Sequence, residues 1–419
     1  MISTVRGARD ILPPEVPGWR LLEETARQIF SSYGYQELRT PIFEQTALFA
    51  RAVGATSDIV EKEMYTFADR GGDSLSLRPE GTAAVVRAFI ENSLHRSLPW
   101  AVCYMGPMFR YERPQKGRYR QFHQMGCELF GAEGPQADAE QMAMILRFLR
   151  RIGVEASLTL EINSLGCTAC RGPYRQRLFD FLQAQASSLC GHCQQRLPRN
   201  PLRTLDCKSE GCRAVAQQAP FMKDHLCGAC ADHFQGLSGH LLALQLPFVI
   251  NPLMVRGLDY YNRTAFEVTT TALGAQNAVA AGGRYDGLVA EMGGVSTPAI
   301  GFAMGMERLV LLLEAAKLEA SRPPFYLVAV GERAARQAML GAERWRDAAL
   351  PVVMDPLGGS LKAQLRRADR ARARYALILG EQELESNTLL VKEMQGGGQF
   401  LLAWEEVAGR LSALIQTTA

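Results

Sequence analysis

Residues 105–131 read MGPMFRYERPQKGRYRQFHQMGCELFG, and this stretch decides the fold. Apolar and polar side chains alternate over residues 109–111 and again over residues 122–129, as they do in antiparallel strands. The turn between them carries residues that suit an anion, namely Arg113, Lys116, Gly117, Arg118 and Arg120. Because a guanidinium group grips phosphate through two parallel hydrogen bonds, an arginine-rich turn favours oriented phosphate oxygens. A solvated basic turn is the alternative. We predict a β-hairpin with a phosphate-binding tip.

A second stretch reads AIGFAMGMERLVLLL at residues 299–313 and carries a single arginine, Arg308, in an apolar frame. A buried cation of this kind needs an anionic partner. Together the two stretches resemble the second and third signature motifs of the class II aminoacyl-tRNA synthetases. The resemblance implies an α/β (α+β) fold whose catalytic core is an antiparallel sheet flanked by helices.

Other stretches narrow the resemblance to the histidyl-tRNA synthetase family. LRPEGT at residues 77–82, VRGLDYYNRTAFEV at 255–268 and AGGRYDGL at 281–288 are similar to its histidine-binding signatures. VRGARDILPPE at residues 5–15 resembles its N-terminal motif, and GYQELRTPIFE at 34–44 resembles its first, dimer-forming motif. The resemblance therefore implies a ligase that joins L-histidine to tRNA(His) and works as a homodimer.

Such a ligase must bring the histidine carboxylate to the α-phosphate of ATP, so cations have to offset the repulsion of two anions. The resemblance implies that Arg110 holds the α-phosphate and the carboxylate. Arg256 would take a position that a metal ion fills in related enzymes, and Arg118 and Arg308 would hold the outer phosphates. Glu112 would contact the adenine and Phe122 would stack on it. Mg²⁺ would accompany the β- and γ-phosphates.

The resemblance also implies a histidine site. Its residues would be Glu80, Gly81, Thr82, Arg110, Gln124, Glu128, Arg256, Tyr260, Tyr261 and Tyr285. Gly282 and Gly283 would allow close backbone approach. Without the resemblance, Glu80 could equally be a carboxylate at a helix N-terminus, and the two adjacent tyrosines could be strand aromatics. In the hairpin loop, Arg113 and Gln115 resemble the residues that read the extra guanylate at the acceptor end of the tRNA, and both suit base-edge hydrogen bonds.

Eight of the ten cysteines form four pairs inside one segment. The pairs are Cys167 with Cys170, Cys190 with Cys193, Cys207 with Cys212, and Cys227 with Cys230. Three have the C-x-x-C spacing that lets two thiolates converge on a tetrahedral zinc ion, and the reducing cytosol argues against disulfides. Small packing cysteines are the alternative. The order of the pairs does not reveal which combine, and His192 or His225 could replace a thiolate. Family members regarded as typical lack this framework, so a structural Zn²⁺ here is a hypothesis from the residues alone.

Composition shifts divide the chain into three parts. We expect a catalytic core at residues 1–165 and 236–320, an inserted cysteine-rich subdomain at 166–235, and a small C-terminal α/β domain at 324–419 after a linker that ends in Pro323 and Pro324. The resemblance makes the last an anticodon-binding domain. In it, Lys362, Arg366, Arg370 and Arg374 recur every four residues on an expected helix. A solvated face is the default for such a stripe, but in this family it would meet the anticodon stem.

Composition excludes other classes of protein. The net charge is only +3, so any nucleic-acid binding must come from local patches. The polar N-terminus and the lack of an apolar run of about 18 residues predict a cytosolic protein with no membrane partner. The competing function is a catalytically inactive relative, the regulatory subunit of ATP phosphoribosyltransferase. We prefer the ligase because the signature arginines and a C-terminal domain are both retained. A zinc-ribbon nucleic-acid module with an unrelated core does not explain the histidine signatures.

Overall fold

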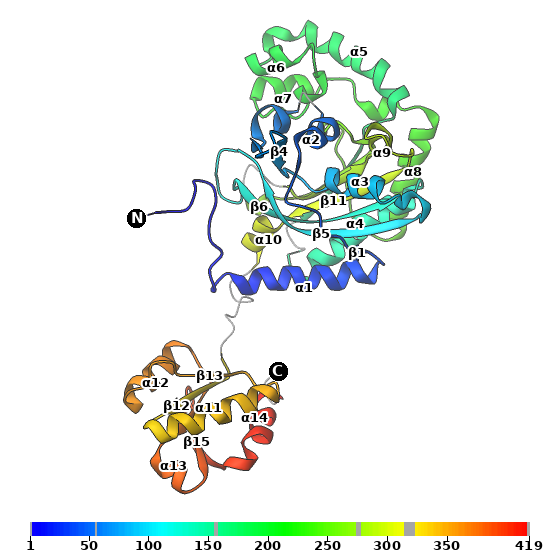
Figure 1. The fold of residues 1–419 in the computed structure, drawn as a ribbon. Helices are drawn as coiled ribbons and strands as arrows, with labels where there is room; N and C mark the ends of the chain where they lie inside the picture. The colour runs from blue at the N-terminus through cyan, green and yellow to red at the C-terminus, as the bar shows by residue number, and fades with distance from the viewer. Residues whose placement is uncertain (1, 55–56, 155–157, 274–277, 314–322, 417–419) are drawn as a thin grey trace. The chain divides into compact units, whose positions relative to one another are not determined.

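The computed structural model describes residues 2–54, 57–154, 158–273, 278–313 and 323–416. The chain divides into two compact units, Met1–Leu318 and Glu319–Ala419 (Figure 1). The end of the core, expected at residue 320, lies outside the described residues. No helix in the described part of the chain combines the length and the apolar character needed to cross a membrane.

The first unit is built on an eight-stranded sheet. In spatial order its strands are β1 (Gln36–Glu37), β5 (Trp100–Phe109), β6 (Gln121–Phe130), β11 (Ala299–Gly305), β10 (Ala278–Arg284), β9 (Asn262–Thr270), β7 (Leu158–Ser164) and β8 (Val249–Ile250). The inner pairs are antiparallel, and the two outermost pairs, β1 with β5 and β7 with β8, are parallel. The antiparallel core predicted from the sequence is therefore confirmed.

The hairpin expected around Arg110 is present as β5 and β6, paired from Trp100 opposite Phe130 to Phe109 opposite Gln121. Both strands stop short of the tip, so residues 110–111 lie beyond the strand in which they were expected. Gly117, with φ of 74°, turns the chain in a left-handed conformation that other residues rarely adopt. The tip is therefore an irregular loop that carries its cations past the edge of the sheet.

Helices cover both faces of this sheet (Figure 1). On one face lie α1 (Val16–Ser32) and α4 (Pro135–Arg151), and Leu22, Ala26 and Phe30 of α1 repeat at the spacing that forms one apolar stripe. On the other face lie α2 (Thr46–Val53), α3 (Thr82–Glu91) and α9 (Leu288–Glu291). Because successive side chains of a strand point to opposite faces, Cys103 joins the first core and Tyr104 the second.

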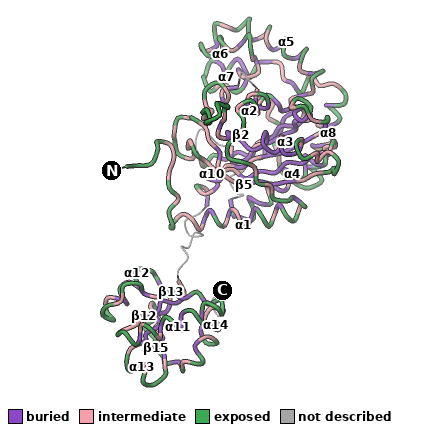
Figure 2. Tube along the Cα trace, viewed as in Figure 1, coloured by how far each residue is buried: buried purple, intermediate pink, exposed green. Residues whose placement is uncertain are grey.

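Smaller elements complete the first unit. A three-stranded sheet, β2 (Phe43–Gln45), β4 (Ser74–Leu77) and β3 (Thr66–Ala68), stands beside α2, and α10 (Met306–Leu312) follows β11 directly. Figure 2 shows the buried residues concentrated along the large sheet and the inner sides of its helices.

The chain between β7 and β8 forms the cysteine-rich part. Its main helices are α5 (Thr168–Ala184), α6 (Gly191–Arg196), α7 (Glu210–Ala216) and α8 (Gly228–Ala243). They share a small core that includes Tyr174, Leu178 and Leu182 of α5. Helix α8 continues past residue 235, and its Leu237 and Leu241 pack in the core of the large sheet. This helix therefore belongs to both regions.

The second unit is a five-stranded sheet flanked by helices. Its strands, in spatial order, are β13 (Val352–Met354), β12 (Phe325–Ala329), β14 (Tyr375–Leu379), β15 (Thr388–Glu393) and β16 (Gln399–Ala403). Its helices are α11 (Glu332–Asp347), α12 (Leu361–Arg370), α13 (Glu381–Glu385) and α14 (Val407–Gln416). The first three strands are mutually parallel and the last two pair antiparallel, in keeping with the expected small α/β domain.

The expected cationic stripe is shorter than its spacing predicted. Lys362, Arg366 and Arg370 lie exposed on α12, but the helix ends at Arg370 and Arg374 lies beyond it. Arg372 adopts a left-handed φ of 54°, and the N–H of Arg374 then donates to the carbonyl of Pro323 at 3.2 Å. The prediction that Arg374 continues the helical stripe is therefore wrong.

Candidate functional site

A cavity of about 400 Å³ lies where the hairpin tip, the loop before β9 and the start of α10 meet. Most of the residues expected to bind ATP and histidine line it, namely Glu80, Thr82, Arg110, Glu112, Arg118, Phe122, Gln124, Arg256, Tyr260, Tyr261 and Arg308. These residues span more than two hundred positions of the sequence, from Glu80 to Arg308. The fold thus brings the predicted site residues together in one place.

The hairpin supplies two of the cavity's arginines. Arg110 donates from Nε to the carbonyl of Pro79 at 2.8 Å and stands over the ring of Phe122, 5.3 Å from its centroid. Arg118 pairs through Nη1 with Oε2 of Glu112 at 2.8 Å. The arginines are held by the backbone and by a carboxylate, so their positive charge lies in place before a ligand arrives.

Arg308 enters the cavity from α10. It donates to the carbonyl of Ala278 in β10. Burial, together with the neighbouring charge of Arg118, lowers the pKa of this guanidinium group. Burial and the like charge therefore disfavour the cationic form of Arg308, and a bound anion would stabilise it.

Arg256 comes from the loop before β9. Its Nη1 donates to Oε1 of Glu267 at 2.5 Å, and its guanidinium lies 5.0 Å from the ring centroid of Tyr261. Its Nε is buried and has no hydrogen-bond partner among the described residues. Buried N–H groups are almost always paired, so this donor is suited to a ligand atom.

Behind the cavity lies a buried polar cluster around Glu128, which is 1% exposed. Thr82 donates its hydroxyl to Oε1 of Glu128 at 2.7 Å, and Tyr285 donates to Oε2 at 2.5 Å. Burial raises the pKa of Glu128 to about 8, although these two hydrogen bonds oppose the rise. Glu128 and Tyr285 do not line the cavity themselves. They contact residues that do: Thr82 is hydrogen-bonded to Glu128, and the ring of Tyr260 lies 5.7 Å from that of Tyr285.

Two further side chains face the cavity. Glu80 accepts hydrogen bonds from the backbone N–H groups of Thr82 and Ala83 at 2.7 and 2.8 Å. These are the contacts of a carboxylate at a helix N-terminus, the alternative that the sequence left open. Because Glu80 also lines the cavity, its role in binding a ligand stays a prediction. Gln124 also lines the cavity, and its Oε1 is buried with no partner among the described residues.

The glycines of this region serve a purpose that the sequence did not indicate. A Cβ on Gly282 would lie 2.3 Å from the carbonyl oxygen of Gly301, and one on Gly283 would lie 2.4 Å from that of Thr264. Their close approach is thus to neighbouring strands. A Cβ on Gly301 would lie 1.5 Å from Oε2 of Glu128, so this glycine makes room for the buried carboxylate. Its position within a strand was the available signal.

Other residues were missed or lie elsewhere. Tyr104, Glu267, Arg203 and Asp206 also line the cavity, and only Glu267 lies inside a stretch that resembles a family signature. The backbone of Gly81 precedes α3, and a Cβ there would strike the ring of Tyr104 at 2.4 Å. Arg113 and Gln115 are exposed on the hairpin tip, outside the cavity lining. They are therefore free to meet a macromolecular ligand.

The eight paired cysteines gather into two clusters. The neck cluster joins Cys167, Cys170, Cys227 and Cys230, and the inner cluster joins Cys190, Cys193, Cys207 and Cys212. The sulfurs of each cluster lie within 4.8 Å of one another, with Cys167 to Cys170 at 3.7 Å and Cys190 to Cys207 at 3.9 Å. Four thiolates around a tetrahedral zinc ion lie about 3.8 Å apart. Neither cluster includes His192 or His225. Both clusters thus have the composition and the spacing of a closed four-thiolate site.

Comparisons with known proteins agree on one family. The model of the histidyl-tRNA synthetase family matches residues 7–309, and that of an anticodon binding domain matches residues 325–414. A histidine–tRNA ligase of Syntrophotalea carbinolica is 50% identical over 100% of this chain and 99% of its own length. One of Geobacter sulfurreducens is 50% identical over 98% of this chain and all of its own. The crystal structure of apo histidyl-tRNA synthetase from S. aureus superposes with a TM-score of 0.82 at 36% identity, covering 98% of this chain and 100% of that one.

Proposed function

Because this chain belongs to the histidyl-tRNA synthetase family of aminoacyl-tRNA ligases, we propose that it activates L-histidine with ATP and transfers the histidine to the 3′ end of tRNA(His). The observation that carries the proposal is a single cavity in which Arg110, Arg118, Arg256 and Arg308 converge beside the polar cluster of Glu128. One part of the cavity suits a polyphosphate, and the other suits a small polar ring.

In the first half-reaction the histidine carboxylate attacks the α-phosphorus of ATP and pyrophosphate leaves. We assign Arg110 and Arg256 to the anions that approach each other, because both guanidinium groups are held by fixed partners and need no rearrangement to act. Arg118 and Arg308 would hold the outer phosphates, which enter with Mg²⁺ as part of the substrate. Phe122 would stack on the adenine, and Glu112 would contact its edge.

The histidine itself would lie between α3 and the tyrosines of the loop before β9. Glu80, with Gln124 and the backbone around Gly81 and Thr82, would bind the α-ammonium and the amino-acid backbone. Glu128, Tyr260, Tyr261 and Tyr285 would surround the imidazole. A buried carboxylate that already accepts from Thr82 and Tyr285 has lone pairs left for a ring N–H.

The proposal is tested by isotope exchange and by charging. Incorporation of labelled pyrophosphate into ATP should depend on added histidine, and tRNA(His) should then be charged. Histidine binding without exchange, under reducing conditions with Mg²⁺, would instead favour the inactive regulatory relative. Because charged tRNA is used in translation, we also propose that the protein is located in the cytoplasm.

We also propose that each cysteine cluster binds one structural Zn²⁺. The segment is too short to derive much stability from its own core, and a closed site of four thiolates supplies folding energy. All four positions of each site would be filled by protein, so no position remains for catalysis.

Two further assignments complete the proposal. The chain would divide into a catalytic core at residues 1–165 and 236–320, an insertion at 166–235 and an anticodon-binding domain at 324–419. It would form a homodimer through the segment at residues 34–44, in which Ile42 and Phe43 are 43% and 54% exposed. Sedimentation should give about twice the chain mass of 46.2 kDa, and a monomer at micromolar concentration would contradict the dimer.

A further inference from the structure

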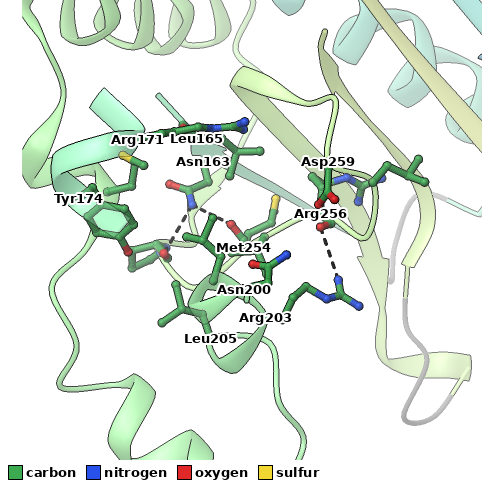
Figure 3. A pocket seen from close by; sticks show the side chains of 15 residues that line it. Asn163, Leu165, Arg171, Tyr174, Asn200, Arg203, Leu205, Met254, Arg256 and Asp259 are labelled. Carbon is green, nitrogen blue, oxygen red and sulfur yellow. Dashed lines mark hydrogen bonds between the residues drawn. The ribbon is translucent and has the colours of Figure 1, made fainter. Parts of the chain in front are cut away.

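The cysteine-rich insertion contacts the loop that carries Arg256 and Tyr261. A small cavity of about 60 Å³ lies where the two regions meet, and Figure 3 shows the side chains around it. Its lining includes Arg171 and Arg203 from the insertion, and Met254, Arg256 and Asp259 from the loop. The insertion is therefore packed directly against residues of the proposed histidine site.

Arg171 makes the closest connection. It lies in the first turn of α5, next to Cys170 of the neck cluster. Its Nη2 donates to the carbonyl of Tyr261, and its Nε donates to the carbonyl of Leu165 at 3.2 Å. The planar guanidinium can serve two carbonyls at once, which an ammonium cannot do in the same geometry. Arg171 does not line the large cavity, so it acts on the site only through the backbone of Tyr261.

A second connection holds the other end of the loop. Arg203 donates from Nη1 to the carbonyl of Arg256 at 3.4 Å, as Figure 3 shows, and it pairs with Asp58 at 3.5 Å. Arg203 lies in a short helical turn, Pro201–Thr204, which shortly precedes Cys207 of the inner cluster. Unlike Arg171, it also lines the large cavity and can meet a substrate there.

The neck cluster is itself fixed to the sheet on its far side. In α8, one turn after Cys230, His233 lies 2.8 Å from Oδ2 of Asp138, and Asp138 pairs through its other oxygen with Arg284 at 2.8 Å. Arg284 directly precedes Tyr285 of the polar cluster. The four cysteines of the neck thus join two helices, each of which is tied to one side of the proposed imidazole site.

We infer that Arg171 is a positioning residue for histidine, and that through it the neck cluster fixes the loop bearing Tyr261. The inference rests on the proposed function and deepens it. The insertion would then set the affinity for the amino acid, in addition to any role toward tRNA. Loss of metal from the neck cluster would then raise the KM for histidine in the first half-reaction.

The test compares Arg171→Met with Arg177→Met, which changes an exposed arginine further along the same helix. We expect Arg171→Met to raise the KM for histidine in pyrophosphate exchange by about tenfold to a hundredfold, the effect of losing one charge-assisted hydrogen bond. The KM for ATP and the metal content should stay unchanged, and Arg171→Lys should recover part of the loss. Arg177→Met should behave like the parent.

Three results would overturn the inference. One is a lower melting temperature with unchanged kinetic constants, which would make Arg171 structural only. Another is an equal rise in both KM values. The third is a Cys167→Ser, Cys170→Ser variant that has lost metal yet keeps the parent's KM for histidine. If the parent shows no exchange, the proposed function fails separately, and calorimetric histidine binding by the parent and Arg171→Met then decides the inference. If Arg171→Met does not fold, Arg171→Lys is compared with the parent in the same assays.

Discussion

The phenolic hydroxyl of Tyr285 lies 2.5 Å from Oε2 of Glu128, and both residues are buried. The carboxylate gains a strong donor, yet burial still raises its pKa to about 8. A buried acid with a pKa near neutrality changes its charge within the pH range in which enzymes work.

This pKa predicts a dependence of stability on pH. The folded-state value lies above the ordinary value of 4.5, so the contribution of Glu128 to stability is fully present below about 4.5 and is lost as the pH rises through about 8. Glu128→Gln removes this loss. The melting temperature of the parent minus that of the variant should therefore decrease from about pH 6 to about pH 9. A difference that stays constant over this range would contradict the raised pKa.

Substitution of Arg256 by alanine should impair activation far more than histidine binding. The guanidinium matters most when the carboxylate and the α-phosphate crowd together, and removal of one such contact commonly lowers the rate about 10²- to 10³-fold. Pyrophosphate exchange gives the rate, and calorimetry gives the affinity. Glu267→Gln, which weakens the ion pair at 2.5 Å but leaves the guanidinium, is the control. Equal losses of rate and affinity would mean that Arg256 only holds the substrate.

The exposed pair on the hairpin tip should matter only once tRNA enters. Arg113→Ala and Gln115→Ala should each reduce kcat/KM for tRNA(His), because each removes hydrogen bonds worth about 1–3 kcal/mol of base discrimination. Pyrophosphate exchange needs no tRNA and should be unaffected. A tRNA with the extra guanylate deleted should lose less with the variants than with the parent. Equal effects on both tRNAs would show that these residues do not read that base.

Metal content should reflect the two clusters. Protein purified without added zinc should contain about two ions per chain. Cys190→Ser with Cys193→Ser should lower this to about one and open the insertion to proteolysis, because the metal supplies folding energy to a small core. A parent free of zinc, with a double variant that is equally resistant to protease, would leave the cysteines as packing residues.

The hairpin could be predicted because its signals are local. Alternation over a few residues defines each strand, and glycine with arginine defines the turn. The residues that gather in the cavity could be named only through the family resemblance, which the short signature stretches carry. The end of α12 was misjudged for a related reason: a four-residue repeat continues through Arg374, while the left-handed turn at Arg372 depends on how the next strand enters its sheet.

The contacts that could not be predicted join distant parts of the chain. The neck cluster unites the first and the last cysteine pairs, which requires that the chain return beside its starting point. Likewise, Arg203 and Asp206 reach the cavity only because the insertion docks on the loop before β9. Nothing in the local sequence of either residue distinguishes it from an ordinary surface charge.

The parallel pairing of β7 with β8, with Glu161 opposite Val249, has a consequence for how this fold can vary. The two ends of the intervening chain are hydrogen-bonded neighbours in the large sheet, so the sheet already holds the loop closed. Lengthening a closed loop is inexpensive, since doubling its length costs only about 0.6 kcal/mol. The segment between these strands is thus a place where the length of the chain can vary while the pairing of β7 with β8 is kept, provided that the apolar side chains of α8 still pack on the large sheet.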